Sequence, residues 1–350
     1  MAEPVRAAGI DVIPAPLGER RPWGEASRMA GAFARREPYV FYRRHDRQAV
    51  RNALTAAIAR ETPSILYLDH LDSMLFAGLS PHSRIVADMH NVYSVLVERT
   101  AAEHPSWLRA RYLEREARLI GRIEQRVATQ VSLVMAVSHP EAAYYRKLGA
   151  SRVEVVPNGV DCGYYAHLPV GRPTPPAPIV LFVGGLGWAP NVAAVEYLAT
   201  TTLPRLRATY PHAIVRIVGR GDSDAIRALA ALPGVEVTGG VTDVRPHLEQ
   251  ACVVAVALES GGGTRLKILE AFAAGIPVVS TPVGCEGIAG EHGRHLIVAP
   301  RDRFAEEIAG LFDQPAAGVR LATEARDLAS TVYDWGVVGR HAAAVIWDGV

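Results

Sequence analysis

A glycine-rich stretch that joins a buried strand to a helix carries the residue types of an anion-binding site. Residues 259–281 read ESGGGTRLKILEAFAAGIPVVST, and Arg265 and Lys267 stand where the helix should begin. Glycines let a backbone approach a ligand closely, and the first N–H groups of a helix have no partner within it. With two cations nearby, this arrangement favours a phosphate or diphosphate.

The rarity of lysine strengthens this interpretation. Lys267 and Lys147 are the only lysines among 37 basic residues. A surface ion pair with Glu270, three residues further on, would be served equally well by arginine. A compact ammonium that faces one phosphate is not interchangeable with a planar guanidinium. We therefore favour the phosphate site over the alternatives of a tight loop or an ordinary surface ion pair.

The second half of the chain alternates short β-branched runs with helix-like segments. Such a pattern predicts an α/β domain in which helices cover both faces of a parallel sheet. The expected strands lie within 179–185, 213–221, 235–241, 252–258, 277–284 and 295–300, and the expected helices within 193–209, 223–232, 245–250, 266–274 and 304–312. The glycine-rich stretch follows a strand, so it lies at the carboxyl edge of the sheet, where such sheets bind ligands. Thr264 is the expected N-cap of its helix.

The first half shows a weaker pattern of the same kind. Strands are expected within 10–17, 64–71, 84–91, 132–138 and 153–159, and arginine-rich helices at 46–60 and 107–130. Turn residues and a proline cluster in 156–178 indicate a boundary. We predict an N-terminal domain at 1–165, a linker at 166–178, a C-terminal domain at 179–330, and a final helix at 331–350 that crosses back to the N-terminal domain.

Composition narrows the possible functions. The net charge of +1 gives no field that would attract nucleic acid, so no nucleic-acid partner is expected. Cys162, Cys252 and Cys285 lack CxxC spacing, which argues for a reducing compartment and against a zinc site. No signal peptide and no run of ~18 apolar residues is present. We expect a cytoplasmic protein, with peripheral association at the inner face of the membrane as an additional option.

Several motifs of the chain resemble those of a known protein family. The segment GGGTRLKILEAFAAGIPVVSTPVGCEG closely resembles the donor-site segment of the GT-B glycosyltransferases, in the large retaining family 4. Further motifs follow in the family's order, namely VSHPEAAYYRKLGASRVEVVPNGVD, VLFVGGLGWAPNVAAVEYL, VRIVGRG, VEVTGGVTDVRPHLEQACVVAVALE and VYDW. The resemblance covers about Ile85 to Trp335. It implies two Rossmann-like parallel-sheet domains and transfer of a sugar from a nucleotide-diphosphate sugar, with retention and without an essential metal or cofactor.

The resemblance also implies roles for individual residues. Glu270 matches the second glutamate of the family's two-glutamate motif, which holds the donor ribose, and Lys267 with Arg265 would face the diphosphate. His90, in DMHN, matches the histidine that reaches the transferred sugar; a strand-end histidine held by local hydrogen bonds is the alternative. The further donor-binding candidates are Gly262, Gly263, Thr264, Glu259, Gly185, Asn191, Gly219 and Val241. The acceptor would be a sugar, a lipid-linked molecule or a small molecule.

Three features depart from the family pattern. Gly262 stands where the first glutamate is expected, so Glu259 or loop N–H groups are the candidates to replace it. The Arg and Lys of the first donor-domain loop are absent, and Asn191 or the helix after it would supply part of the missing phosphate contact. The family's opening strand and glycine-rich loop have no counterpart before AAGIDVIPAPLG. We therefore expect this chain alone to be a poor catalyst that still binds nucleotide.

Other functions remain open on the same residues. A GT-B-like auxiliary subunit is favoured by the missing glutamate and opposed by Lys267, Glu270 and His90. A sugar-nucleotide epimerase or hydrolase would need further carboxylates around the sugar. A homo-oligomer or a partner subunit is a further option. The DxD in GDSD (221–224) is typical of metal-bound donors in GT-A enzymes, but here it begins a helix, so Asp222 or Ser223 is expected to be a cap.

Overall fold

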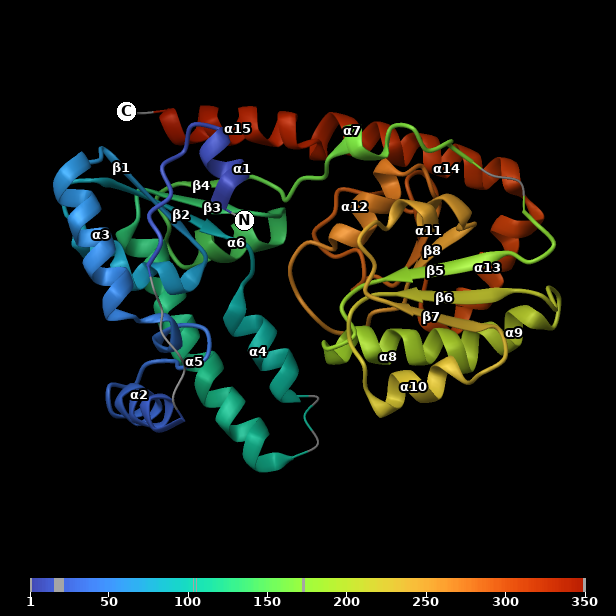
Figure 1. The fold of residues 1–350 in the computed structure, drawn as a ribbon, viewed down its shortest axis with the longest axis horizontal. Helices are drawn as coiled ribbons and strands as arrows, with labels where there is room; N and C mark the ends of the chain where they lie inside the picture. The colour runs from blue at the N-terminus through green and yellow to red at the C-terminus, as the bar shows by residue number, and fades with distance from the viewer. Residues whose placement is uncertain (1, 16–21, 103, 105, 172–173, 349–350) are drawn as a thin grey trace. The chain divides into compact units, whose positions relative to one another are not determined.

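The computed structural model describes residues 2–15, 22–102, 104, 106–171 and 174–348, and the chain divides into two compact units (Figure 1). The first unit is Met1–Val155 and the second is Val156–Val350. The division falls earlier than the expected domain end at 165, so the segment expected as a linker lies within the second unit. Both units are α/β with parallel sheets, which confirms the predicted fold class. The predicted return of the C-terminal helix to the first domain stays a prediction.

The first unit is built on a four-stranded parallel sheet in the order β1-β2-β3-β4. Its strands are β1 (Ile65–Asp69), β2 (Arg84–Met89), β3 (Leu133–Ala136) and β4 (Val153–Val155), each within a predicted run. Its helices are α1 (Ala2–Ala7), α2 (Pro22–Ala34), α3 (Gln48–Glu61), α4 (Tyr93–Ala102), α5 (Trp107–Gln130) and α6 (His139–Lys147). Asp69 pairs in register with Asp88, so the residues that follow β1 and β2 emerge at the same edge.

The strand predicted at 10–17 is wrong over the residues that the structure describes. Residues 10–15 form no strand there, and 16–17 lie outside the described residues. Pro14 has no N–H to donate to a ladder. Ile10 and Ile13 are exposed, so the apolar alternation of this segment has no sheet to pack against.

The second unit contains a six-stranded parallel sheet in the order β10-β9-β8-β5-β6-β7 (Figure 1). Its strands are β5 (Ile179–Val183), β6 (Ile214–Val218), β7 (Val235–Gly239), β8 (Val253–Val256), β9 (Val278–Ser280) and β10 (Ile297–Val298). β5 lies between β6 and β8. On one side of β5 the order continues with β6 and β7, and on the other side with β8, β9 and β10, so the strand order reverses at β5. The crevice at such a switch point is where open α/β sheets bind ligands.

Helices cover both faces of this sheet. The α-helices of the second unit are α7 (Cys162–Tyr165), α8 (Ala189–Tyr197), α9 (Leu203–Arg207), α10 (Asp224–Ala230), α11 (Arg245–Gln250), α12 (Leu266–Ala273), α13 (Phe304–Asp313), α14 (Pro315–Leu328) and α15 (Trp335–Trp347). Every residue of β8 is buried, and so are Ile268 and Phe272 on the inward face of α12. This packing fixes the strand and the helix that flank the glycine-rich stretch.

One helix start differs from its prediction. Arg265, not Thr264, occupies the N-cap of α12, and no side chain caps this end. Within the described residues, no helix combines the length and the apolar character needed to cross a membrane.

Candidate functional site

A cleft of about 320 Å³ opens in the second unit, beyond the carboxyl ends of β5 and β8. Its volume is within the range of small-molecule sites. The cleft is lined by Val183, Gly184, Gly185, Trp188, Asn191, Leu258, Gly262, Thr264, Arg265, Leu266, Lys267 and Glu270. Most of the predicted donor-binding residues of this unit are therefore brought together at the switch point of the sheet.

The ammonium of Lys267 is in direct contact with an amide and an aromatic ring. Its Nζ atom lies 2.9 Å from Oδ1 of Asn191 and 4.0 Å from the centre of the Phe182 ring. Burial, followed by repulsion from Arg265, lowers the pKa of Lys267 to about 7, while Glu270 acts in the opposite direction. A group whose charged form is this destabilised gains most when an anion enters the cleft.

Gly184 and Asn191 make room for this lysine and hold it. A Cβ atom at Gly184 would lie 2.8 Å from Nζ of Lys267 and 3.0 Å from Nδ2 of Asn191. Asn191 is buried, and its Nδ2 donates a 2.8 Å hydrogen bond to the carbonyl of Gly185. The amide is thereby oriented so that its oxygen accepts from Lys267. Asn191 thus orients the cation rather than leaving it to rotate.

Arg265 is committed mainly to the glycine-rich stretch itself. Its side chain is buried, and Nη1 donates to the carbonyls of Gly262 and Gly263, the latter at 3.0 Å. Nη2 lies 3.5 Å from the carbonyl of Val283. These bonds hold the shape of the stretch. If Arg265 also contacts a diphosphate, as predicted, its guanidinium has to share its N–H donors between the phosphate and the backbone carbonyls.

The mouth of the cleft is shaped by Gly261 and Trp188. Gly261 has a φ of 119°, a conformation that side chains rarely adopt, and a Cβ there would lie 2.5 Å from the Trp188 ring. The ring therefore packs directly on the backbone of the glycine-rich stretch. Thr264 lines the same cleft, and its hydroxyl is buried without a hydrogen-bond partner.

Glu270 is half-buried and is held by a residue from a distant segment. The hydroxyl of Tyr165 donates a hydrogen bond to its carboxylate. Burial raises the pKa of Glu270, while the bond from Tyr165 and the charge of Lys267 act to lower it. Glu270 and Lys267 are three residues apart on α12, and both line the cleft.

Four predicted residues lie outside the lining of the cleft. Glu259 forms a 2.8 Å ion pair with Arg301. Gly219 packs against the carbonyl of Gly184, where a side chain would overlap it. Val241 is exposed in the segment after β7. The carbonyl of Gly263 accepts from Arg265.

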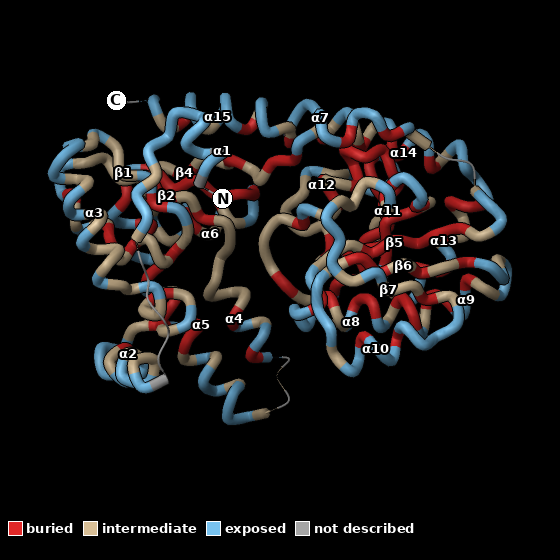
Figure 2. The backbone as a smooth tube through the Cα atoms, in the orientation of Figure 1, coloured by how far each residue is buried: buried red, intermediate tan, exposed pale blue. Residues whose placement is uncertain are grey.

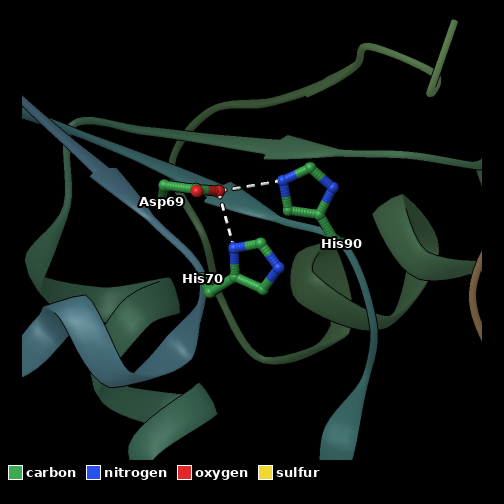
Figure 3. Close-up of side chains that lie close together, drawn as sticks. All are labelled: Asp69, His70 and His90. Carbon is green, nitrogen blue, oxygen red and sulfur yellow. Dashed lines mark hydrogen bonds and ion pairs between the residues drawn. The ribbon is translucent and has the colours of Figure 1, made fainter. Parts of the chain in front are cut away.

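His90 lies at the edge of the first sheet, directly after β2, in a cluster that Figure 3 shows in close-up. Oδ1 of Asp69 lies 3.0 Å from Nε2 of His90 and 2.7 Å from Nδ1 of His70. The two imidazole rings stack with their centres 4.4 Å apart. Asp69 thus bridges both histidines and fixes the orientation of His90.

The backbone next to this cluster is strained. His70 has a φ of 65°, and its N–H donates a 3.0 Å hydrogen bond to the carbonyl of Asp88. The hydroxyl of Tyr67 donates to the carboxylate of Asp88. Burial raises the pKa of Asp88, and the bond from Tyr67 opposes this effect. Unusual backbone conformations of this kind cluster at functional sites.

Asp69, His70 and His90 also have the chemistry of metal ligands. Their ligand atoms all lie within 4.8 Å of one another, and they form the one such group within the described part of the chain. The DxD motif behaves differently. Ser223 caps α10, which confirms the predicted cap, and both Asp222 and Asp224 pair with Arg227.

Sequence reasoning missed Trp188, Tyr165 and Asp69. Trp188 stands inside the quoted GGLGWAPN, but only the structure shows that it packs on Gly261. Tyr165 stands in a segment interpreted as a boundary. Asp69 stands in LYLDH, near the end of the strand predicted within 64–71, and His90 follows DM near the end of the strand predicted within 84–91. Two neighbouring parallel strands that both end in Asp and His are the signal that could have found it.

Comparison with known families gives the class of this protein. The family model described as Glycosyltransferase Family 4 matches residues 2–164, and the one described as Glycosyl transferases group 1 matches residues 177–314. The two models together account for most of the chain, in agreement with its two parallel-sheet units. The chain belongs to the GT-B glycosyltransferases of family 4.

Curated relatives align over part of the chain. A glycogen synthase of Mycobacterium tuberculosis (strain H37Rv) is 31% identical over 209 residues, which is 56% of this chain and 49% of the relative. A phosphatidyl-myo-inositol mannosyltransferase of Mycolicibacterium smegmatis is 32% identical over 200 residues, or 55% of this chain and 50% of the relative. The chain spans about half the length of the curated relatives it matches.

Solved structures share the fold. Sucrose-phosphate synthase from Thermosynechococcus elongatus superposes with a TM-score of 0.66 at 17% identity, over 85% of this chain and 76% of that one. Anabaena HepE, solved in complex with UDP and glucose, gives 0.63 at 17% identity, over 85% and 81%. A glycosyltransferase from Rickettsia africae gives 0.66 at 13% identity, over 99% and 87%.

Proposed function

We propose that this protein transfers a sugar from a nucleotide-diphosphate sugar to an acceptor, with retention at the anomeric carbon and without an essential metal ion or cofactor. The observation that carries the proposal is the environment of Lys267. Its ammonium faces an amide and an aromatic ring, and no ion pair of Lys267 with a carboxylate is found among the described residues. A diphosphate in the cleft would supply the missing counter-charge.

The chemistry of sugar transfer fits this placement. As the bond to the anomeric carbon breaks, negative charge grows on the departing diphosphate. Lys267 and the N-terminal end of α12, with the positive end of its dipole, both border the cleft where that charge would develop. Groups that meet growing charge stabilise the transition state more than the ground state, which is what accelerates a reaction.

The remaining residues of the cleft suggest how the donor is held. We assign Glu270 to the ribose hydroxyls, because Tyr165 orients its carboxylate from the side. The half-exposed ring of Trp188 offers an apolar face to the nucleotide or the sugar. The orphaned hydroxyl of Thr264 fits a donor phosphate oxygen. The UDP complexes of Anabaena HepE support a nucleoside diphosphate as the leaving group.

The acceptor and the role of His90 are proposed from relatives and from the family motif. The names of the two curated relatives are those of a glycogen synthase and a lipid mannosyltransferase, which supports a sugar or a lipid-linked acceptor. We assign His90 to the transferred sugar on the strength of its motif, with Asp69 as the residue that positions it. We place the protein in the cytoplasm, because Cys162, Cys252 and Cys285 lack the CxxC spacing of a disulfide or zinc framework.

The test is turnover of a panel of nucleotide-diphosphate sugars, chosen by thermal stabilisation, with and without candidate acceptors. We expect acceptor-dependent release of the nucleoside diphosphate, and a product whose anomeric configuration by NMR equals that of the donor. Equal release without any acceptor would indicate a hydrolase. Binding without any turnover would indicate an auxiliary subunit, and an inverted product would refute retention.

A further inference from the structure

Helix α2 exposes its apolar side. Trp23 is 88% exposed and Phe33 65%, and Met29 is half-exposed. Ala26 and Ala30 are exposed between them, and Figure 2 shows much of α2 in the colour of exposed residues. The positions of these apolar residues repeat at helical spacing, which places them along one side of the helix. An amphipathic helix of a globular protein normally turns such a stripe toward the core.

The opposite side of α2 packs against the rest of the first unit through charged groups. Glu25 accepts from Arg28 and from the hydroxyl of Tyr39, and it pairs with Arg47 at 3.2 Å. Ala32 is the buried residue on this side. The helix is therefore anchored by its polar side, and the large side chains of its apolar side are mostly exposed.

The start of α5 also exposes large apolar side chains. Trp107 is 69% exposed and Leu108 64%, and Tyr112 lies one turn further on with its ring partly exposed. One contact joins the two helices: the guanidinium of Arg115 lies 4.4 Å from the centre of the Phe33 ring. We name the exposed apolar residues of both helices the α2–α5 surface; they are Trp23, Met29, Phe33, Trp107, Leu108 and Tyr112.

Arginines border this surface. Beyond Trp107, the exposed stripe of α5 continues at helical spacing with Arg111, Arg118 and Arg122, whereas Arg115 is half-buried and pairs with Glu116 at 3.0 Å. Arg35 and Arg36 are exposed directly after α2. Of the three glutamates of α5, Glu116 and Glu124 are buried and only Glu114 is exposed; Glu98 is exposed on the neighbouring α4. The surface therefore combines large apolar side chains with an excess of positive charge.

We propose that the α2–α5 surface docks the first unit onto a lipid bilayer that contains anionic lipids. Amphipathic helices that lie in a membrane interface carry Trp, Phe and Leu on one side and basic residues beside them. Trp is favoured at the boundary between headgroups and acyl chains, and arginines reach back to anionic headgroups. The inference is independent of the transfer reaction proposed above.

Charge decides between a bilayer and a second copy of the chain. If two copies met through this surface, the arginine rows of both would be brought together, and like charges across an interface are unfavourable. An anionic bilayer complements the same row. An acidic protein partner would also complement it, and the experiment must separate that case.

The test is sedimentation of the full chain with vesicles of phosphatidylcholine, with and without phosphatidylglycerol. We expect binding that requires the anionic lipid and weakens with salt. Trp23→Ser combined with Trp107→Ser and Leu108→Ser should weaken binding by at least about tenfold. Arg111→Glu with Arg118→Glu should abolish the preference for anionic vesicles. Matched controls in the second unit are Trp347→Ser and the pair Arg320→Glu, Arg340→Glu, all at exposed positions.

A second measurement uses the unmodified protein. Brominated lipids should quench part of its tryptophan fluorescence, and Trp23→Phe with Trp107→Phe should remove that quenching. Unchanged melting temperature and nucleoside-diphosphate binding would show that the variants are folded. Absence of binding to anionic vesicles, or equal binding by parent and variant, would overturn the proposal. So would a dimer in light scattering that the Trp and Leu substitutions dissociate without any effect on vesicles.

Discussion

Lys267 donates a hydrogen bond from Nζ to the side-chain oxygen of Asn191, 2.9 Å away, while its ammonium lies against the ring of Phe182. Both interactions orient the cation without neutralising it. The positive charge therefore remains available to an anion that enters the cleft. This relationship joins α8 to α12 across the carboxyl ends of β5 and β8, and it underlies the first three predictions.

Two replacements of Lys267 should separate the effect of its charge on donor binding from the effect of its shape. Lys267→Ala should weaken binding of a nucleoside diphosphate roughly 10- to 100-fold, the value of a hydrogen bond to a charged group, and should depress turnover. Lys267→Arg should restore only part of the loss, because a planar guanidinium does not fit the space beside Gly184. Isothermal titration and initial rates would measure both effects.

The matched control is the other lysine. Lys147 is exposed in the last turn of α6, so Lys147→Ala and Lys147→Arg should leave binding and rate unchanged. If Lys267→Arg were as active as the parent, Lys267 would be an ordinary surface charge.

Donor affinity should depend on pH through Lys267. The pKa of Lys267 in the empty cleft is lowered to about 7, and a bound diphosphate should raise it again by favouring the charged form. Below about pH 7 the free protein already carries the charge, so affinity is at its full value. As the pH rises above 7, binding must take up a proton, and affinity should fall by up to about tenfold per pH unit until the pKa of the complex is reached.

Calorimetry in buffers of different ionisation enthalpy would measure this proton uptake. It should be clear near pH 8 and small near pH 6. Lys267→Arg keeps its charge throughout, so it separates the titration of the lysine from that of the phosphate. Equal proton uptake by parent and variant would show that Lys267 is already charged in the free protein.

Asn191 should be sensitive to a change of one atom. Asn191→Asp places a carboxylate beside Nζ of Lys267, where it would neutralise the ammonium and repel a diphosphate. We expect donor affinity to fall at least about tenfold and the pH dependence above 7 to disappear. Asn191→Ala removes the orienting amide without adding charge, so its loss should be smaller. An Asp variant that binds as tightly as the parent would place the donor elsewhere.

Much of the fold could be predicted from the sequence because parallel strands are buried on both faces. The run CVVAVAL predicts β8, in which every residue is buried. Helix α2 was not predicted, because its apolar residues face outward and its sequence PWGEASRMAGAFA includes two glycines. Pattern reasoning assumes that apolar stripes point inward, and α2 departs from that assumption.

The site could be predicted only where its residues are close in sequence. Lys267 and Glu270 stand on one helix, so their spacing alone places them together. Tyr165 reaches Glu270 from a distant segment, and Arg301 reaches Glu259 from beyond β10, so tertiary packing decides both contacts. Arg265 was expected to face a ligand because of its charge. Its bonds to Gly262 and Gly263 arise from a loop shape that sequence does not reveal.

Glu270 should bind the donor, whereas Tyr165 should only position it. Glu270→Gln should weaken donor binding about tenfold or more without unfolding the protein, because charge-assisted bonds to hydroxyls are worth ~1.5–3 kcal/mol each. Tyr165→Phe removes one orienting bond and should cost only a few-fold. Glu196→Gln, on the exposed side of α8, is the matched control. Unchanged binding with a lower melting temperature would make Glu270 a structural residue.

The last prediction concerns metal ions and the cluster at the end of β1 and β2. EDTA should leave transfer largely intact, because Lys267 and the start of α12 meet the charge that a metal meets elsewhere. His90→Ala should lower kcat roughly 100-fold with a much smaller change in donor binding, because we assign His90 to the transferred sugar and not to the nucleotide. Asp69→Asn should reproduce part of that loss, because it alters the hydrogen bond to Nε2 of His90. His70→Gln should have a small effect, since its ring stacks on His90 without orienting its nitrogens.

Elemental analysis of each variant completes the test. One set of results would show that the metal-independent mechanism is wrong and that Asp69, His70 and His90 are metal ligands. In that case chelation would abolish activity, and manganese, magnesium or zinc would restore it. The metal content would also fall in both His70→Gln and His90→Ala.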